Sequence, residues 1–187
     1  MSQDRDNNYW QVPESGREYA GKLLNPANGG YDPAGFDDLC KVSQKHDVTV
    51  RDFVAESGKK HIEDGIDVNN NCERILFKDG RVGAGRKGVA VTIKGGSSSI
   101  SLEGVVVTDP GRHCDIEIGN HSDQSWKPCE RIFIADCRRA DGQPVRVAWG
   151  RGSRPIIRGG NVRIVWWWTV ALHLYVYAKH YFPRLIP

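Results

Sequence analysis

The sequence predicts an all-β chain wound as a β-solenoid of about four to five coils. The first observation is a repeat, because the segment from Cys72 to Asp79 returns in a similar form from Cys129 to Asp136. The second is another series of alternating apolar residues, out of phase with this repeat. The third is a set of Gly, Asn and Asp positions between the two series, where a chain can turn sharply. Two interleaved strand series with a shared period of about 27 residues are typical of a solenoid.

The repeated segment belongs to a first strand series. Its members begin with Val48, Ile75, Ile100 and Ile132, so each starts roughly one period after the member before it. Apolar and polar residues alternate in each member, so one face of the strand is buried and the other meets water. A single coil cannot bury its apolar face, whereas stacked coils form a continuous core.

A second strand series shares this period. Its apolar pairs start at Ile66, Val91, Ile116 and Val145, again at nearly constant intervals. A third and weaker strand follows the first series at residues 82 and 105–107. Residues that accept positive φ mark the corners between strands. These corners are Asp79-Gly80, Gly95-Gly96, Gly119-Asn120 and Gly150.

With these features, residues 48–160 resemble the right-handed parallel β-helix superfamily, the pectate-lyase-like group. The resemblance implies a right-handed coil of parallel strands. It also implies either a stalk-like component of a phage particle or a protein that acts on polysaccharides. Within it, Asp64-Gly65-Ile66-Asp67 resembles a fragment of the polygalacturonase signature. The paired Asp-Asp, Gly-His-Gly and Arg-x-Lys motifs that accompany it in that family are not found in order, so a corner at Asp64-Gly65 is the simpler interpretation.

The chain divides into three expected regions. Residues 1–35 are polar and predict an extended N-terminal arm. Residues 36–160 form the β-helix, which begins with a short amphipathic helix over residues 36–46 that caps the open end of the coils. Residues 161–187 form an aromatic C-terminal segment for assembly or anchoring.

Composition restricts the classes of function. The 26 basic and 23 acidic residues give a net charge of only +3, which does not indicate nucleic-acid binding. No apolar segment resembling a signal peptide follows Met1, so we expect a cytoplasmic protein, or a virion protein that is cytoplasmic before assembly. The five cysteines are expected to be reduced, with structural roles for Cys72, Cys114 and Cys129. Their spacing predicts neither a metal site nor a cofactor.

The second strand series carries the candidates for catalysis. Asp67, Thr92, Glu117 and Arg146 occupy equivalent outward positions, each between two apolar residues. Strands about 4.8 Å apart would separate Asp67 from Glu117 by about 9.6 Å. Inverting glycosidases hold their carboxyl groups roughly 6.5–9.5 Å apart, so the spacing permits this chemistry. The outward faces of solenoids are usually charged and solvated, and we therefore assign no catalytic role.

The insertion from His121 to Pro128 carries the candidates for ligand binding. Trp126 lies near His121 and Asp123 and could stack on a sugar ring. The alternative is that the indole folds back onto the solenoid.

The C-terminal segment is unusually aromatic. Alternating apolar residues favour a strand that closes the solenoid or crosses to a partner. The alternative is a membrane-anchoring helix over residues 164–182, although the apolar run is shorter than the roughly 20 residues of a spanning helix. Either structure leaves an aromatic surface that needs a partner. The residues expected to form it are Trp166, Trp167, Trp168, Leu172, Leu174, Tyr175 and Tyr177.

The sequence therefore favours a non-enzymatic structural or interaction protein. We expect a subunit of a larger assembly, such as a phage virion or tail, with a homo-oligomer and in particular a trimer as its form. One alternative is a β-helix protein that binds or cleaves a polysaccharide, with a glycan as partner. The other is a surface protein with a β-helix head and a membrane anchor.

Overall fold

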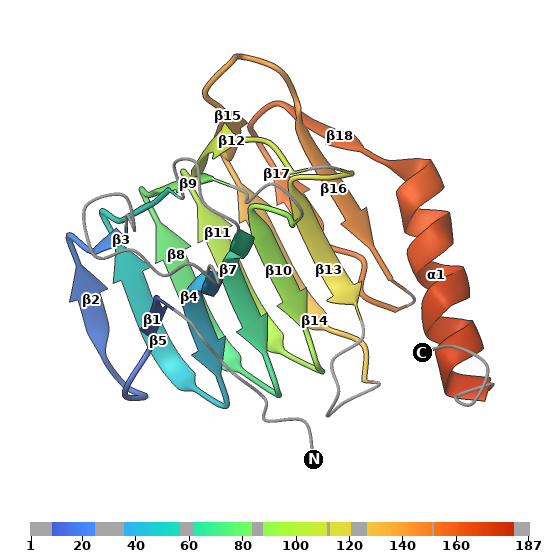
Figure 1. The fold of residues 1–187 in the computed structure, drawn as a ribbon, viewed down its shortest axis with the longest axis horizontal. Helices are drawn as coiled ribbons and strands as arrows, with labels where there is room; N and C mark the ends of the chain where they lie inside the picture. The colour runs from blue at the N-terminus through green and yellow to red at the C-terminus, as the bar shows by residue number, and fades with distance from the viewer. Residues whose placement is uncertain are drawn as a thin grey trace.

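A computed structural model describes residues 9–24, 36–56, 62–83, 88–111, 113–120, 127–150 and 152–181. In these ranges the chain forms eighteen β strands and one α helix. The strands belong to three parallel sheets, and almost every strand pairs with the strand three places later in the chain (Figure 1). Three successive strands therefore make one turn of a stack, and each new turn adds one strand to each sheet.

The first sheet, sheet A, is the longest of the three. Its residues stay in step from turn to turn, so that Ile66 lies opposite Val91 and Val91 lies opposite Ile116. In spatial order its strands are β1 (Trp10–Gln11), β4 (Phe36–Ser43), β7 (Ile62–Asn69), β10 (Val91–Lys94), β13 (Ile116–Asn120), β16 (Val145–Trp149) and β18 (Val162–Ile164).

The second sheet, sheet B, contains the repeat that the sequence revealed. Val48, Ile75, Ile100 and Ile132 lie opposite one another on successive strands, which confirms the predicted first strand series. In spatial order its strands are β17 (Ile156–Arg158), β14 (Glu130–Ala135), β11 (Ser98–Glu103), β8 (Glu73–Lys78), β5 (His46–Arg51) and β2 (Glu18–Ala20).

The third sheet, sheet C, consists of shorter strands. Val82 lies opposite Val107, so the weaker third series of the sequence is also confirmed. In spatial order its strands are β15 (Arg138–Arg139), β12 (Val106–Asp109), β9 (Arg81–Gly83), β6 (Val54–Ala55) and β3 (Leu23–Leu24).

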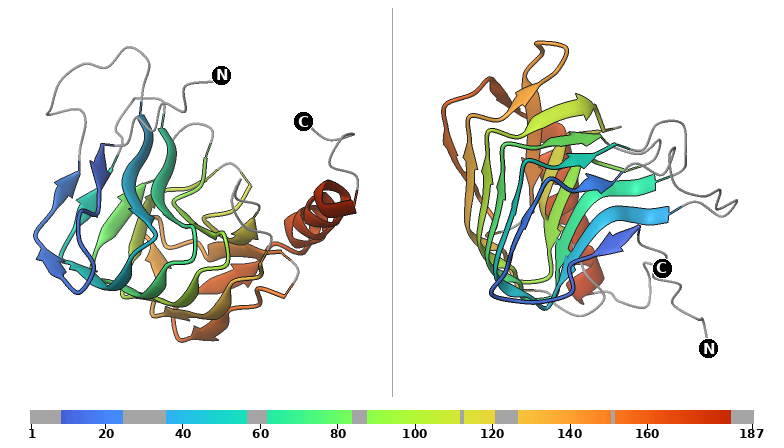
Figure 2. Two further views of the ribbon diagram at one scale, coloured as in Figure 1. Left: turned by 90° about the horizontal axis from the view of Figure 1, so that it is seen from below. Right: turned by 90° about the vertical axis from the view of Figure 1, so that its left-hand side faces the viewer.

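The three sheets surround an interior, as a view along the stack shows (Figure 2). One apolar core fills this interior. The inward residues of the central strands are almost completely buried, as the alternation of apolar and polar residues requires, and those of the end strands β1, β2, β17 and β18 are partly buried. Aromatic rings fill the wider places, and Phe53 packs edge-on against Phe77 with ring centroids 5.7 Å apart. Each turn thus buries its apolar face against the turns before and after it.

The corner between sheets B and C repeats one backbone geometry. The residue after each strand of sheet B has a positive φ, with values of 51° at Asp52, Asp79 and Asp136. Gly104 occupies the same place with a φ of 63°. A β-carbon on Gly104 would lie 2.6 Å from Asp79 Oδ1, because the Asp79 side chain of the neighbouring turn occupies the space beside this glycine. The predicted corner at Asp79-Gly80 is confirmed, as is the turn at Gly95-Gly96.

The expected capping helix over residues 36–46 is wrong. Phe36–Ser43 is strand β4, which pairs with β7 in parallel over six residue pairs, and strand β5 starts at His46. Leu39, Cys40 and Val42 are all buried, so two adjacent apolar residues interrupt the alternation of the strand. That interruption produced the helix-like spacing in the sequence.

The region expected as a polar N-terminal arm is more ordered than predicted. Residues 10–24 contain β1, β2 and β3, which pair in parallel with β4, β5 and β6 and so complete an additional turn. Residues 1–8 and 25–35 of the expected arm lie outside the described ranges.

The C-terminal segment is a helix, and the strand favoured by its alternating residues is wrong. Helix α1 (Trp166–Tyr181) follows β18 and runs beside the last strands of sheet A (Figure 1). Its buried residues pack on an outer face of sheet A, where Val165 and Leu172 meet Ala148 and Cys114. No helix within the described ranges has the length and hydropathy needed to cross a membrane.

Candidate functional site

Sheet A carries the residues that the sequence singled out for catalysis. Asp67, Thr92 and Glu117 lie opposite one another on β7, β10 and β13, as predicted. They are not solvated, however, because their exposed fractions are only 1%, 3% and 5%. The expectation of a charged face in water is therefore wrong for these positions.

The predicted position of Arg146 is also wrong. Glu117 lies opposite Ala148, because Val147 and Trp149 oppose Ile116 and Ile118. The strand is displaced by two residues from the register that its valines indicated, since Trp149 fills a core position. Arg146 consequently lies beside Asp115 and does not extend the row of Asp67 and Glu117.

Three carboxyl groups and two lysines meet on sheet A where β4, β7 and β10 adjoin. Lys41 lies opposite Asp67, and Asp38 lies opposite Asp64. Asp67 projects away from the core because Ile66 and Val68 on either side of it belong to that core. We refer to Asp38, Lys41, Asp64, Asp67 and Lys94 as the lysine–carboxylate cluster.

The contacts of this cluster centre on Asp67. Lys94 Nζ lies 3.3 Å from Asp67 Oδ1, and Lys41 Nζ lies 3.9 Å from Asp67 Oδ2. The Asn69 side-chain amide also donates to Asp67 Oδ2 at 2.7 Å. Lys41 Nζ is 3.8 Å from Asp38 Oδ2, so this lysine is shared between two carboxyl groups. Asp64 Oδ1 accepts a hydrogen bond of 3.1 Å from the backbone N–H of Val89.

Burial determines the protonation of the cluster. Burial, together with the charges of Asp67 and Asp64, raises the pKa of Asp38 to about 8, although Lys94 and Lys41 oppose the shift. Burial also raises the pKa of Asp64 to about 7, although Lys94 opposes this shift, and it raises the pKa of Asp67. Burial lowers the pKa of Lys94, but the three carboxylates outweigh it and raise that pKa overall. Asp38 therefore retains a proton at neutral pH, and Asp64 is close to its titration midpoint there.

The geometry suits a structural role for the cluster better than catalysis. Asp38, Asp64 and Asp67 are all buried, which leaves little surface that a polysaccharide could touch. Among the described residues, no group of three or more His, Cys, Asp or Glu side chains could hold a metal ion. The cluster joins three successive turns through side chains that meet between strands.

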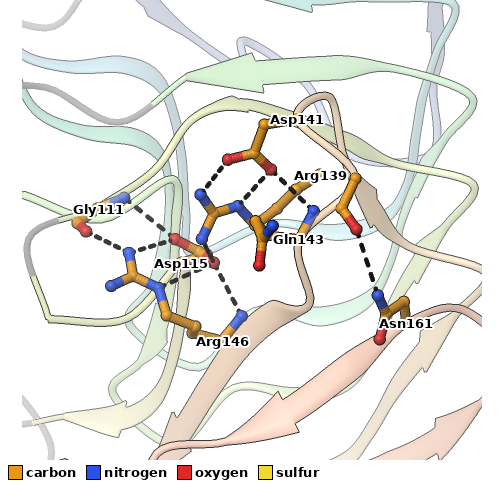
Figure 3. A network of polar contacts seen from close by, with 8 residues as sticks. Gly111, Asp115, Arg139, Asp141, Gln143, Arg146 and Asn161 are labelled. Carbon is orange, nitrogen blue, oxygen red and sulfur yellow. Dashed lines mark hydrogen bonds and ion pairs between the residues drawn. The ribbon is translucent and has the colours of Figure 1, made fainter.

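A second buried carboxylate, Asp115, is paired with arginines (Figure 3). Its side chain is fully buried, and Arg146 Nη2 donates to Asp115 Oδ1 at 2.8 Å. The Arg146 backbone N–H donates to Asp115 Oδ2, also at 2.8 Å, and Arg139 Nη1 lies 3.8 Å from that oxygen. The Gly111 backbone N–H donates to Oδ1 at 3.2 Å, while Arg146 donates to the Gly111 carbonyl at 2.5 Å. Asp115 thereby connects β16 and β15 to the chain segment before β13.

A third carboxylate, Glu117, lies beneath helix α1. The indole Nε1 of Trp168 donates to Glu117 Oε2 at 2.7 Å. The Trp168 ring also stacks on His113, with centroids 4.4 Å apart and planes inclined by 22°. Glu117 therefore positions the helix on the sheet.

The two sides of α1 have different surroundings. Trp168 and Leu172 face sheet A, whereas Trp166, Trp167, Val170 and Leu174 are 65%, 60%, 55% and 64% exposed. Only this second set stays available for the expected assembly or anchor surface. Tyr175 and Tyr177 belong to α1, but their side chains lie outside the described residues.

The five cysteines are free and buried, as predicted for Cys72, Cys114 and Cys129. Burial raises the pKa of Cys129 and of Cys137 to about 11, so these thiols stay protonated at neutral pH. Protonated and inaccessible thiols are poor nucleophiles and metal ligands.

The residues predicted to bind a ligand cannot be placed. Trp126, His121 and Asp123 all lie outside the described ranges. Sequence reasoning, in turn, missed the partners in the buried sites, namely Asp38, Lys41, Lys94, Asp115 and Trp168. The sequence did carry a signal for Lys94. It directly follows the apolar Ile93, so strand alternation places its side chain on the same outward face as Thr92.

Comparison of the chain with protein-family models, curated proteins and solved structures found no match.

Proposed function

We propose that this chain is a non-enzymatic structural or interaction protein, a right-handed parallel β-helix held in a larger assembly through one side of helix α1. The observation that carries the proposal is the exposed apolar stripe of Trp166, Trp167, Val170 and Leu174. We refer to these four residues as the exposed face of α1.

The spacing of these residues makes them one surface. Trp166, Val170 and Leu174 are four residues apart and therefore lie on one side of a helix, with Trp167 beside them. A fully buried Trp removes about 150–250 Å² from water, so two exposed indoles are a large unused apolar area. Contiguous apolar patches of this kind mark interaction surfaces in soluble proteins.

The buried polar sites also support an interaction protein. Their charged groups meet one another, with Asp115 on Arg146 and Asp67 on Lys94. Charged groups that are paired inside the molecule hold the stacked turns together. Because they are buried and already paired, they are not available to bind or protonate a substrate. Right-handed coiling is supported by the nearly universal handedness of crossovers between parallel strands.

The expected phage virion or tail component and the expected trimer stay predictions. The polysaccharide alternative also stays a prediction, because its binding candidates around Trp126 lie outside the described residues.

The test compares the unmodified full-length chain with two full-length variants in which exposed leucine or valine residues are replaced by glutamate. A V170E/L174E variant removes the exposed face, and L23E is the matched control because Leu23 on β3 is 73% exposed and lies in a different part of the fold. We expect the unmodified chain and L23E to exceed the monomer mass in light scattering or to be retained on an alkyl matrix, and V170E/L174E to do neither. A 20.9 kDa monomer that the matrix retains no better than V170E/L174E would overturn the proposal.

A further inference from the structure

We infer that the partner of the exposed face is a lipid bilayer with anionic headgroups, against which α1 lies parallel to the membrane plane. This inference rests on the proposed function and names the surface to which the protein attaches. Helices with tryptophan on an apolar side and basic residues nearby bind at the boundary between headgroups and acyl chains.

Charge is the first argument. Residues 142–187 contain seven of the 26 basic residues and none of the 23 acidic ones, so this last quarter of the protein carries +7. The whole chain carries +3, which leaves −4 on residues 1–141. The basic residues of this region are Arg146, Arg151, Arg154, Arg158, Arg163, Lys179 and Arg184.

Two of these arginines lie on the strands that end the stack, shortly before α1 in the chain. Arg158 and Arg163 are exposed and belong to β17 and β18, the last strands of sheets B and A. Strand β18 leads into helix α1, which starts three residues after Arg163 (Figure 1). An anionic surface that receives the tryptophans would also meet these arginines.

The position of α1 fixes the mode of contact. One side of the helix is held on sheet A by the hydrogen bond from Trp168 to Glu117 and by Leu172. Trp166 also touches Trp149 edge-on, with ring centroids 5.7 Å apart. Among the described side chains of α1, lipid can therefore reach those of Trp167, Val170 and Leu174, which corresponds to shallow insertion at the interface.

The same charges disfavour a second copy as the occupant. Two copies that met through their exposed faces would bring together two regions with a sequence charge of +7 each, of which only Arg146 is paired with the buried Asp115 among the described contacts. Repulsion between like charges would oppose that contact, whereas an anionic bilayer supplies the complementary charge.

The experiment measures co-sedimentation of the full-length chain with phosphatidylcholine vesicles, with or without phosphatidylserine. We expect binding to the vesicles that contain phosphatidylserine, with weakening in high salt because screening reduces the attraction. V170E/L174E should abolish binding, whereas L23E should leave it unchanged. R158Q/R163Q should weaken it roughly thirtyfold, at about fivefold for each basic residue near the surface. Circular dichroism and thermal melting will establish that each variant is folded.

The outcomes separate the two proposals. Absence of sedimentation with phosphatidylserine vesicles, or equal sedimentation with neutral vesicles, overturns the anionic bilayer as partner. If the chain then still associates with itself or a matrix in a manner that V170E/L174E removes, the proposed function stands without the lipid. If V170E/L174E changes neither property, both proposals are wrong.

Discussion

Sheet A buries carboxylates in two different ways within a few strands. In the lysine–carboxylate cluster, three carboxyl groups share two lysines on β4, β7 and β10. Next to these strands, beside β13 and β16, Asp115 meets Arg146 through both carboxylate oxygens and is approached by Arg139. The first site has more acids than bases, and the second has more bases than acids.

The difference shows how the cation type controls a buried acid. A guanidinium presents several donors in a fixed plane, so Arg146 holds Asp115 in one geometry, and hydrogen bonding to Asp115 raises the pKa of Arg146. A lysine is a point charge that several acceptors can share. Because the lysines are too few for three carboxylates, the cluster keeps a proton on Asp38 and becomes sensitive to pH.

The largest expected effect is at the arginine site. R146M should lower the free energy of unfolding by about 3–5 kcal/mol, because it leaves the buried Asp115 without its main partner. Urea denaturation will measure the change. The exposed Arg158 is the control, and R158M should change stability by less than about 0.5 kcal/mol. A loss below about 1 kcal/mol for R146M would contradict the dependence of Asp115 on this arginine.

A smaller loss is expected in the lysine–carboxylate cluster. K94M should cost about 2–3 kcal/mol at neutral pH, because Asp67 keeps Lys41 and the carboxyl groups can take up a further proton. The cost should shrink at pH 5, where protonation is easier. K78M on the exposed side of β8 provides the control in the same urea experiment. A cost as large at pH 5 as at pH 7 would show that the lysine acts through packing alone.

The pH dependence of stability is the third test. Asp38 has a folded-state pKa of about 8, above its unfolded value of 3.8, so the folded state binds the proton more tightly. Its contribution to stability is complete below about pH 4 and decreases as the pH rises toward 8. D38N cannot ionise, and it should flatten this slope and be more stable than the unmodified chain at pH 8.

Urea midpoints between pH 4 and pH 8 will measure that slope, with D52N at an exposed corner as the matched control. If D38N retained the full slope, the retained proton would belong to another group.

The smallest effect is expected at an ion pair whose acid is exposed. Asp141 holds Arg139 from the solvent side, with Asp141 Oδ2 2.5 Å from Arg139 Nη2 (Figure 3). The Asp141 side chain is 51% exposed and that of Arg139 is 12% exposed, so water and salt compete for the carboxylate and reduce the contribution of the pair. D141A should therefore leave the thermal midpoint unchanged within error. A clear decrease would mean that Asp141 positions Arg139 on the buried Asp115.

The stacked strands could be predicted because each carries a complete local signal. Ile75, Ile100 and Ile132 each begin an apolar-polar alternation, and each strand ends at an aspartate or glycine corner. Register then follows, since a slip by one residue would turn the apolar side chains away from the core. The predicted register was wrong at β16. The sequence pattern places Val145 and Val147 opposite Ile116 and Ile118, whereas Val147 and Trp149 occupy these positions in the structure.

The C-terminal helix could not be recognised from alternation because two periods coincide there. Trp166, Val170 and Leu174 form one row at intervals of four, and Trp168 and Leu172 form another. Together they give every second residue, which is also the pattern of a strand. The packing of Trp168 and Leu172 on sheet A decides between the two structures.

The buried polar sites could not be predicted for a different reason. Outward positions of stacked strands are solvated by default, and neither Asp67 nor Glu117 differs in type from a solvated residue. Their burial depends on neighbours distant in the sequence, such as Lys41 for Asp67 and Trp168 for Glu117. Such pairings depend on the tertiary fold, and one chain alone carries no direct sign of them.

The sequence shared at the start of strands β8 and β14 has a consequence for how the gene of this protein can change length. Residues 72–75 and 129–132 share the sequence Cys-Glu-Arg-Ile and occupy the same place in sheet B, two turns apart. Recombination between these stretches would delete or duplicate the segment from one to the other and leave the sequence at the junction unaltered. The product would differ by two whole turns, with every strand still facing a neighbour of the same sheet. Shorter and longer versions of this protein would accordingly arise in steps of complete turns.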